Sequence, residues 1–421
     1  ASRGKGPWLF DPTGKKYLDY GMGLRSVSLG YSNPAVNQAA KRALQRGNNL
    51  TLPHRFELEA AELVTHTIPG AEMVKFAKNG SNATTAAVKL ARAFTGRKKI
   101  MVPDNQPFFS FDDWFIGSTP VIRGIPDSSR TDTLKFRYGD ANHLAQLFEA
   151  NPDQISCVIM EPLTSTTPCS AHAPDEQWQS RRGPCEECLR SGSNFLIQVQ
   201  DLCDQHGALL IMDEMITGFR WSQHGASQDF GVKPDLTTFG KAISNGFSLA
   251  FVAGREEVMA LGSIEPEGME RTFLLSSTHG AEMTSLAAFI QVGRIYEKKN
   301  VINHLWDYGR ELRTAMTRVA NEAGLEGRLR VKGPDCLLTL EFLAEDPDRG
   351  DLARTLFLQE MAGQGVLIPW IAPSLSHDDR HLRRTVHAIE QTMPVVARAM
   401  TSDDYSAVQG PAVKPVFRKF N

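Results

Sequence analysis

The chain has 421 residues, with 46 lysines and arginines against 48 aspartates and glutamates and a formal net charge of −2. This balance excludes the broad basic surface that binds nucleic acid or an anionic membrane. With 41% hydrophobic and 22% charged residues, the composition is typical of a globular protein large enough for two domains. No apolar run is long enough to span a membrane. Six cysteines in a chain of this length favour a reducing, cytoplasmic setting. The first residues lack an initiator methionine and do not resemble a signal peptide, so we expect further residues upstream.

The N-terminal part predicts a hairpin followed by helices. Residues 7–21 contain two aromatic-rich runs on either side of DPTG, a sequence that favours a tight turn. Apolar periodicity and closing glycines predict helices at 33–47, 56–70 and 82–96, with a short extended run at 73–80.

Strand and helix patterns then alternate. Buried strands are expected at 155–162, 208–214, 235–240 and 249–254, and an amphipathic helix at 194–207. This alternation predicts an α/β architecture with a largely parallel sheet.

The pattern changes after Gly280. A long helix is expected at 281–298. It is followed by a strand at 336–343, a helix at 352–365, a strand at 366–369 and a final helix at 378–400. We therefore expect three segments. Residues 1–45 begin a small domain, residues 46–280 form a large domain with a cysteine-containing insertion at 167–192, and residues 281–421 supply a linking helix and the rest of the small domain.

Two polar side chains follow neighbouring strands. Asp213 ends ALLIMDE and Lys241 follows DLTTFG. Carboxyl ends of parallel strands line a common crevice, so we expect the two side chains to converge on one ligand. Pyridoxal phosphate needs an amine for its aldehyde and a carboxylate for its pyridine nitrogen. Gly80, Ser81 and Asn82, at the start of an Ala-rich helix, offer backbone donors for its phosphate. Singly, these residues also suit a surface loop, a strand-end cap and a helix N-cap; their order and shared positions favour the joint interpretation.

Three segments carry a family resemblance. Residues 4–20, 209–221 and 231–247 resemble class III aminotransferases of fold type I, closest to the glutamate-1-semialdehyde aminomutase-like branch. The resemblance extends over about residues 4–400. It implies a large domain with a mostly parallel central sheet, a smaller α+β domain, and pyridoxal 5′-phosphate as cofactor.

The resemblance also implies roles for residues around the cofactor ring. Lys241 would form the covalent link to the aldehyde, and Asp213 would pair with the pyridinium. Met215 would press on one ring face. Phe108 or Phe109 would stack on the other, where the family has a Tyr-His-Gly run and this chain has PFFS.

Further implied residues hold the phosphate. Gly80, Ser81 and Asn82 would bind it within one subunit, and Ser277 or Thr278 would reach the phosphate of the partner subunit. A homodimer is implied because the active sites of this family are built across the subunit interface.

Candidate substrate contacts are weaker signals. Arg25, His54 and Arg55 suit carboxylates or hydroxyls, although His54 and Arg55 equally suit the start of the following helix. Ser165, Thr166 and Thr167 would form a hydroxyl-rich wall for a polyhydroxylated substrate.

The chain departs from the aminomutase pattern in ways that bear more on the substrate than on the chemistry. The Ser-Gly-Thr-Glu-Ala motif reads NGSNA, LTSTTP follows Glu-Pro, and Leu24 replaces an aromatic residue. We therefore expect transfer of an amino group from L-glutamate to a polyhydroxylated keto acid, specifically 3-dehydroshikimate giving 3-aminobenzoate in natural-product assembly. The alternatives are a glutamate-1-semialdehyde 2,1-aminomutase, a decarboxylase-like variant and a keto-sugar aminotransferase. A non-catalytic binding protein would have lost Lys241 or Asp213, and both are present.

The insertion contains a possible metal site. Cys169, His172, Cys185 and Cys188 give the spacing C-x2-H-x12-C-x2-C, which suits a tetrahedral zinc ion. The alternative is a surface loop with thiols that bind nothing.

Overall fold

The computed structural model describes residues 1–106, 108–163, 166–169, 181–264, 268, 270–275, 278–280, 282–414 and 416–418. Contacts divide the chain into two compact units. The smaller contains Ala1–Pro34 and Lys299–Val416, and the larger contains Ala35–Lys298 and Phe417–Asn421.

The larger unit is built on a mixed sheet. In the described part of the chain this sheet has seven strands, in the order β4-β10-β9-β8-β7-β5-β6. Their bounds are Met73–Ala77 (β4), Ala250–Gly254 (β10), Leu236–Phe239 (β9), Leu209–Asp213 (β8), Ile155–Met160 (β7), Lys99–Pro103 (β5) and Thr133–Phe136 (β6). Only β10 runs against its neighbours among these strands, so the carboxyl ends of β4, β8 and β9 share one edge. The prediction of a mostly parallel sheet is confirmed.

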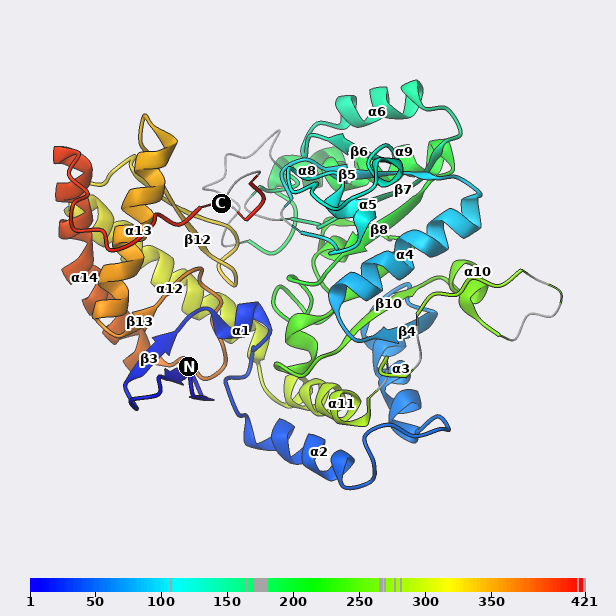
Figure 1. The fold of residues 1–421 in the computed structure, drawn as a ribbon, viewed down its shortest axis with the longest axis horizontal. Helices are drawn as coiled ribbons and strands as arrows, with labels where there is room; N and C mark the ends of the chain where they lie inside the picture. The colour runs from blue at the N-terminus through cyan, green and yellow to red at the C-terminus, as the bar shows by residue number, and fades with distance from the viewer. Residues whose placement is uncertain are drawn as a thin grey trace. The chain divides into compact units, whose positions relative to one another are not determined.

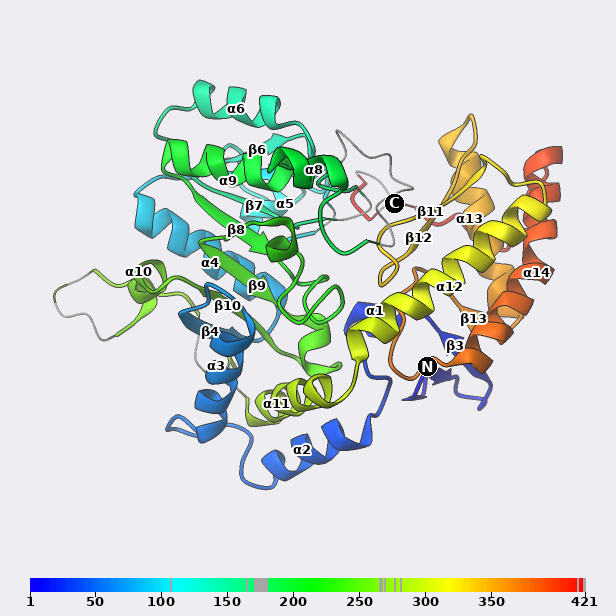
Figure 2. The ribbon, with the colours of Figure 1, turned by 180° about the vertical axis from the view of Figure 1, so that it is seen from behind.

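Helices cover both faces of this sheet. Helix α4 (Gly80–Thr95) packs on one face, and α6 (Ala141–Ala150) and α9 (Phe195–His206) pack on the other (Figures 1 and 2). Half of the buried residues of α4 are alanines, so its axis can approach the sheet closely. Its N-cap is Asn79, whose side chain accepts a hydrogen bond from the Asn82 N–H, and its C-cap is Gly96 in the left-handed region.

Three more helices belong to the larger unit. They are α2 (Pro34–Leu44), α3 (Arg55–Thr67) and α11 (Met283–Lys298). Residues of all three form one hydrophobic cluster around Ala43, Met283 and Ala287. This packing explains why α11 lies in the larger unit, whereas the sequence analysis grouped residues 281–298 with the C-terminal segment. Shorter helices are α5 (Asp113–Ile116), α8 (Glu186–Ser191) and α10 (Glu256–Met259), with 3₁₀ turns η1 (Asp127–Ser129), η2 (Ser227–Phe230), η3 (Lys241–Ser244) and η4 (Ala260–Gly262).

The smaller unit joins both ends of the chain. Strands β1 (Arg3–Lys5), β2 (Trp8–Phe10), β3 (Lys16–Asp19) and β13 (Val366–Leu367) form one sheet, and β11 (Leu329–Lys332) pairs with β12 (Thr339–Phe342). The predicted hairpin is β2–β3. The helices are α1 (Met22–Arg25), α12 (Val301–Glu322), α13 (Pro347–Gly363) and α14 (Asp379–Ser402).

Several elements differ from the sequence prediction. Helix α4 begins at Gly80, two residues before the expected start, because Asn79 and not Ser81 is the N-cap. Helix α2 ends at Leu44 rather than Gly47. Helices α6 and α12 and strands β5 and β6 were not predicted. Among the described residues, no helix combines the length and apolar character needed to cross a bilayer.

Candidate functional site

Asp213 is a buried carboxylate at the carboxyl end of β8. Every residue of β8 is buried, and Asp213 is 2% exposed. Its Oδ1 accepts hydrogen bonds from the Thr238 hydroxyl and from the Met215 backbone N–H, both at 3.0 Å. Burial raises the pKa of Asp213 to about 6, although the charge of Lys241 and these hydrogen bonds act in the opposite direction. The side chain therefore lies where a cation would stabilise its ionised form.

Lys241 lies directly beyond the neighbouring strand. Asp213 is paired in register with Thr238 on β9, and Lys241 follows three residues later as the first residue of η3. Its backbone φ of 49° lies in the left-handed region, which costs free energy for a residue with a side chain. Helix α11 packs against η3. The fold thus holds this lysine in a strained conformation beside the carboxylate.

Met215 lies where three chain segments meet. A Cβ atom on Gly240 would lie 2.6 Å from the Met215 Sδ, and a Cβ on Gly80 would lie 3.1 Å from it. Met215 also packs with Ala77 and Ala83. The end of β8, the end of β9 and the start of α4 therefore converge on this thioether, and glycine at position 240 permits the approach.

The start of α4 offers backbone donors. The Asn79 side-chain oxygen accepts a hydrogen bond from the Asn82 N–H. The N–H groups of Gly80 and Ser81 have no acceptor within the part of the chain that the structure describes. The Ser81 hydroxyl oxygen accepts from the Phe111 N–H at 3.2 Å. The first turn of α4 can therefore bind an anion through main-chain N–H groups and the helix dipole.

The two phenylalanines proposed for the ring face occupy different environments. Phe109 is 2% exposed and belongs to the core between the sheet and α4, and its carbonyl accepts from the Thr84 hydroxyl at 2.8 Å. Phe108 is 48% exposed, with its ring edge-to-face with Phe115 at 5.9 Å. Of these two, Phe108 has the accessible ring.

The structure describes only some of the residues proposed for the partner subunit's phosphate and for the hydroxyl-rich wall. Ser277 and Ser165 lie outside the described residues. Thr278 is exposed, and its carbonyl accepts from the Asn49 side-chain amide. Thr167 is fully buried, and its hydroxyl oxygen accepts from the Cys169 N–H at 3.0 Å, so it faces the protein interior.

Thr166 lines a hollow of about 580 Å³, which is also lined by Arg137, Tyr138 and Gln198. Neither Lys241 nor Asp213 lines it.

His54 and Arg55 have partners on their own helix. His54 is the N-cap of α3, accepting from the Phe56 N–H, while the Glu57 carboxylate accepts from the His54 N–H. Arg55 pairs with Glu59 one turn later at 2.7 Å. The alternative interpretation as a helix cap is therefore confirmed for His54, whereas Arg55 is the first residue of the helix and pairs with Glu59 instead of capping it. Contact of either residue with a substrate stays a prediction.

Arg25 lies in an unusual turn of the smaller unit. Met22, Leu24 and Arg25 all have positive φ angles, and the Arg25 guanidinium lies 5.2 Å from the Trp370 ring centroid. The Asp19 carboxylate stabilises the turn by accepting from the N–H groups of Gly21 and Met22. Such clustered backbone strain is typical of functional segments.

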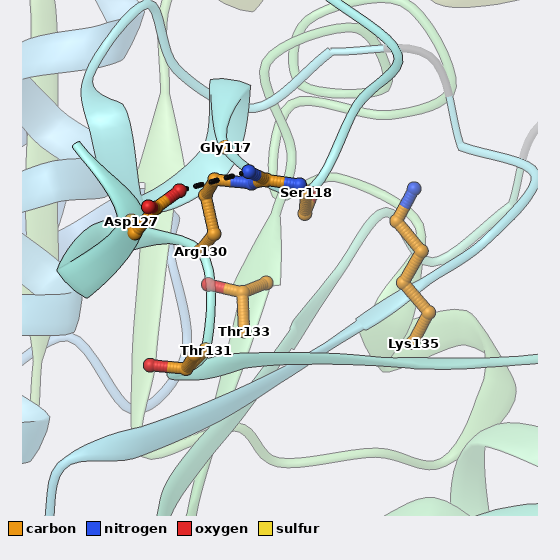
Figure 3. A pocket seen from close by; sticks show the side chains of 7 residues that line it. All are labelled: Gly117, Ser118, Asp127, Arg130, Thr131, Thr133 and Lys135. Carbon is orange, nitrogen blue, oxygen red and sulfur yellow. Dashed lines mark hydrogen bonds and ion pairs between the residues drawn. The ribbon is translucent and has the colours of Figure 1, made fainter. Parts of the chain in front are cut away.

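A separate hollow lies beside β6. It measures about 480 Å³, and Figure 3 shows that its lining includes Lys135, Thr133 and an Arg130–Asp127 ion pair of 2.9 Å. None of the residues proposed above lines this hollow.

Three structurally important residues were missed. Asn79 had a readable signal, because Asn before an Ala-rich helix favours an N-cap. Gly240 was recognised only as a neighbour of Lys241. Thr238 gave no signal, since its hydrogen bond to Asp213 depends on how β8 and β9 pair.

Comparisons with known proteins identify relatives over nearly the whole chain. A family model described as "Aminotransferase class-III" matches residues 1–177 and 189–393, which leaves residues 178–188 and 394–421 outside the match. Glutamate-1-semialdehyde 2,1-aminomutase of Methanothermobacter thermautotrophicus is 28% identical over 411 residues, covering 93% of this chain and 91% of that protein. The enzyme of the same name from Thermomicrobium roseum is 28% identical over 419 residues, covering 94% and 91%.

The fold is shared with solved structures. The pyridoxal-phosphate internal aldimine form of the FumI protein of Sphingopyxis sp. MTA144 superimposes with a TM-score of 0.79 at 24% identity, covering 95% of this chain and 89% of that one. This likeness confirms the predicted fold type I architecture.

Proposed function

The chain belongs to the class-III aminotransferase family of pyridoxal-phosphate enzymes, and we propose that Lys241 and Asp213 hold the cofactor and control its protons. Bound there, pyridoxal phosphate supplies an aldehyde that takes up an amino group and a cationic ring that stabilises the charge left by a departing proton. The Lys241 Nζ is the amine that tethers the aldehyde, and it accepts and returns the substrate proton.

The observation that carries this proposal is the environment of Asp213. A buried carboxylate with a pKa raised by burial gains most from a cation placed against it. Among the described residues, both hydrogen bonds to this carboxylate go to Oδ1, and Oδ2 would be the oxygen that holds the cofactor's cationic ring. The residues present therefore fit the cofactor.

Other residues suit the rest of the cofactor. The N–H groups of Gly80 and Ser81, at the start of α4, bind the phosphate, with Asn82 beside them. Met215 covers one ring face, and Phe108 covers the other in preference to Phe109, because the Phe109 ring is part of the core.

The amino acceptor is a polyhydroxylated keto acid, with 3-dehydroshikimate as the first candidate and L-glutamate as donor. The support is chemical. Two of the departures from the aminomutase pattern, LTSTTP after Glu-Pro and Leu24, lie at positions proposed for the substrate, whereas Lys241 and Asp213 are kept. Arg25, in its strained turn, is the candidate for the substrate carboxylate, because a guanidinium binds a carboxylate through paired hydrogen bonds. Amination of its ketone followed by loss of the two remaining ring hydroxyls as two water molecules would give 3-aminobenzoate.

A second candidate is a glutamate-1-semialdehyde 2,1-aminomutase. It is favoured by the names of the two relatives, which match more than nine-tenths of this chain at 28% identity. An aminomutase returns the amino group to the same carbon skeleton, so it needs no separate donor.

One experiment separates the two candidates. The cofactor-loaded protein is incubated with L-glutamate alone, then with 3-dehydroshikimate, and the products are measured by mass spectrometry. We expect 2-oxoglutarate in the first step and an aminated product in the second. Absence of 2-oxoglutarate, together with conversion of glutamate-1-semialdehyde to 5-aminolevulinate, would favour the aminomutase and reject the transamination.

A homodimer is part of the same proposal. Leu50, Leu52 and Phe273 are exposed in the larger unit, and Leu52 is 76% exposed. Single exposed apolar side chains are common on protein surfaces, but an interface between subunits would cover them. The neighbouring Thr278 is the described candidate for the partner's phosphate. Light scattering of the purified protein tests the dimer.

A further inference from the structure

Three thiols meet at the start of α8, two from its first turn and one from 16 residues earlier in the chain. Cys169 and Cys188 are buried and Cys185 is half-buried. Their three sulfur atoms lie within 4.8 Å of one another. None of the six cysteines of the chain, all of them described, forms a disulfide. The cluster therefore brings together three soft ligand atoms of one kind.

The spacing of the sulfurs suits a tetrahedral metal ion. Zinc binds thiolates at about 2.3 Å, so two sulfurs on one ion lie about 3.8 Å apart. Sulfurs already within 4.8 Å can reach this arrangement by side-chain rotation. A disulfide would use two of the three thiols at about 2.0 Å and leave the third unsatisfied.

The backbone around the cluster favours bound thiolates. The Cys185 N–H donates to the Cys169 Sγ at 3.3 Å, and the Cys188 N–H donates to the Cys185 Sγ at 3.5 Å. Such N–H···S hydrogen bonds orient sulfur ligands and offset their negative charge. Cys185 is also the N-cap of α8, so the C-x2-C pair spans its first turn.

The cluster lies beside the core of the larger unit. Cys169 lies two residues after the buried Thr167, whose hydroxyl oxygen accepts a hydrogen bond from the Cys169 N–H. The Pro168 carbonyl accepts from the Phe195 N–H at the start of α9, which packs on β8. A metal at this point would link α8 to the segment that is hydrogen-bonded to α9.

We propose that Cys169, Cys185 and Cys188 bind a structural zinc ion that the family as a whole does not share. Cys185 and Cys188 lie within residues 178–188, outside the match to the family model. On binding, each thiol that becomes a ligand releases its proton to solvent and its sulfur donates an electron pair to Zn²⁺; no oxidation occurs. The sequence predicted His172 as a fourth ligand, but it lies outside the described residues, and the proposal rests on the three thiols.

Metal content tests the proposal directly. The full-length protein, grown in zinc-supplemented medium and purified without chelator, is analysed by plasma mass spectrometry. We expect about one zinc ion per chain, and at least tenfold less in the double variant Cys185→Ala/Cys188→Ala. Cys203→Ala is the matched control, since this buried cysteine of α9 lies outside the cluster, and it should keep its zinc.

A second measurement does not depend on the variants. Replacing the metal of the unaltered protein by Co²⁺ should give the near-ultraviolet charge-transfer band of thiolate ligands. Zinc well below one ion per chain, in protein whose cysteines are all reduced, would overturn the proposal. An intact mass lower by two hydrogen atoms would also overturn it, because it indicates a disulfide. Absorption by bound pyridoxal phosphate is recorded on the same samples. Failure of the zinc site with intact cofactor absorption would leave the proposed function standing.

Discussion

The Thr238 hydroxyl donates a hydrogen bond of 3.0 Å to Oδ1 of Asp213, across the parallel pair β9 and β8. This donor stabilises the ionised form of the buried carboxylate and leaves its second oxygen for the proposed cofactor. Hydrogen bonds to charged groups contribute about 1.5–3 kcal/mol. The site therefore depends on a residue that carries no chemistry of its own.

Thr238→Val should lower kcat/KM by about tenfold to a hundredfold, because the isosteric side chain removes this donor and raises the pKa of Asp213 further. Steady-state kinetics across pH would measure it. Thr237→Val is the control, since the Thr237 hydroxyl donates to the Met212 carbonyl and not to Asp213. Equal losses in both variants would indicate general damage to β9.

Lys241→Ala should leave no covalent cofactor adduct after borohydride reduction and negligible turnover, because the tethering amine is gone. Intact-protein mass spectrometry checks the adduct. Lys233→Ala removes an exposed lysine from the loop that precedes β9 and should retain both adduct and activity. An adduct that persists on Lys241→Ala would move the cofactor to another lysine.

Cofactor binding should weaken as the pH falls below about 6. The pKa of Asp213 is raised from 3.8 to about 6 in the cofactor-free protein, so the carboxyl is protonated below that pH and offers no charge to the pyridinium. Affinity should fall by up to about tenfold per pH unit there. The cofactor phosphate also titrates near pH 6. In Asp213→Asn, the part of the pH dependence of affinity that comes from the cofactor phosphate should remain, and the part that comes from Asp213 should disappear. Fluorescence titrations of cofactor binding by both proteins across pH would measure the two parts.

Gly240→Ala should weaken cofactor binding, because the new Cβ would lie 2.6 Å from the Met215 Sδ and displace either Met215 or the segment that carries Lys241. Shortening the opposing side chain in Gly240→Ala/Met215→Ala should recover part of the loss. A double-mutant cycle on the dissociation constant measures this coupling. Additive losses would mean that the two residues do not contact each other.

Phe108 and Phe109 should respond differently to truncation. Phe109→Ala should lower the free energy of unfolding by about 3–5 kcal/mol, because its ring fills the core between the sheet and α4. Phe108→Ala should change stability little and weaken cofactor binding. Denaturant unfolding and cofactor titration of both variants provide the comparison. A large stability loss for Phe108→Ala would remove it as the ring-facing residue.

The sequence by itself determined the chemistry and the class of fold. Buried strands such as β7 and β8 are continuous apolar runs, and the positions of Asp213 and Lys241 just beyond strands were readable because parallel strands share a carboxyl edge. Strands β5 and β6 were missed, since short strands carry little local signal. Helix α12 was also missed, although its apolar residues recur with helical spacing.

Only the tertiary structure decided which side chains meet. The contact of Thr238 with Asp213 depends on strand register, and the approach of Gly240 to Met215 depends on how β8 and β9 end against α4. Which of Phe108 and Phe109 is accessible to a cofactor depends on which ring is buried in the core. Spacing suggested the thiol cluster, but proximity of its sulfurs within 4.8 Å is a property of the folded chain. Long-range contacts of this kind arise from packing, which local sequence does not specify.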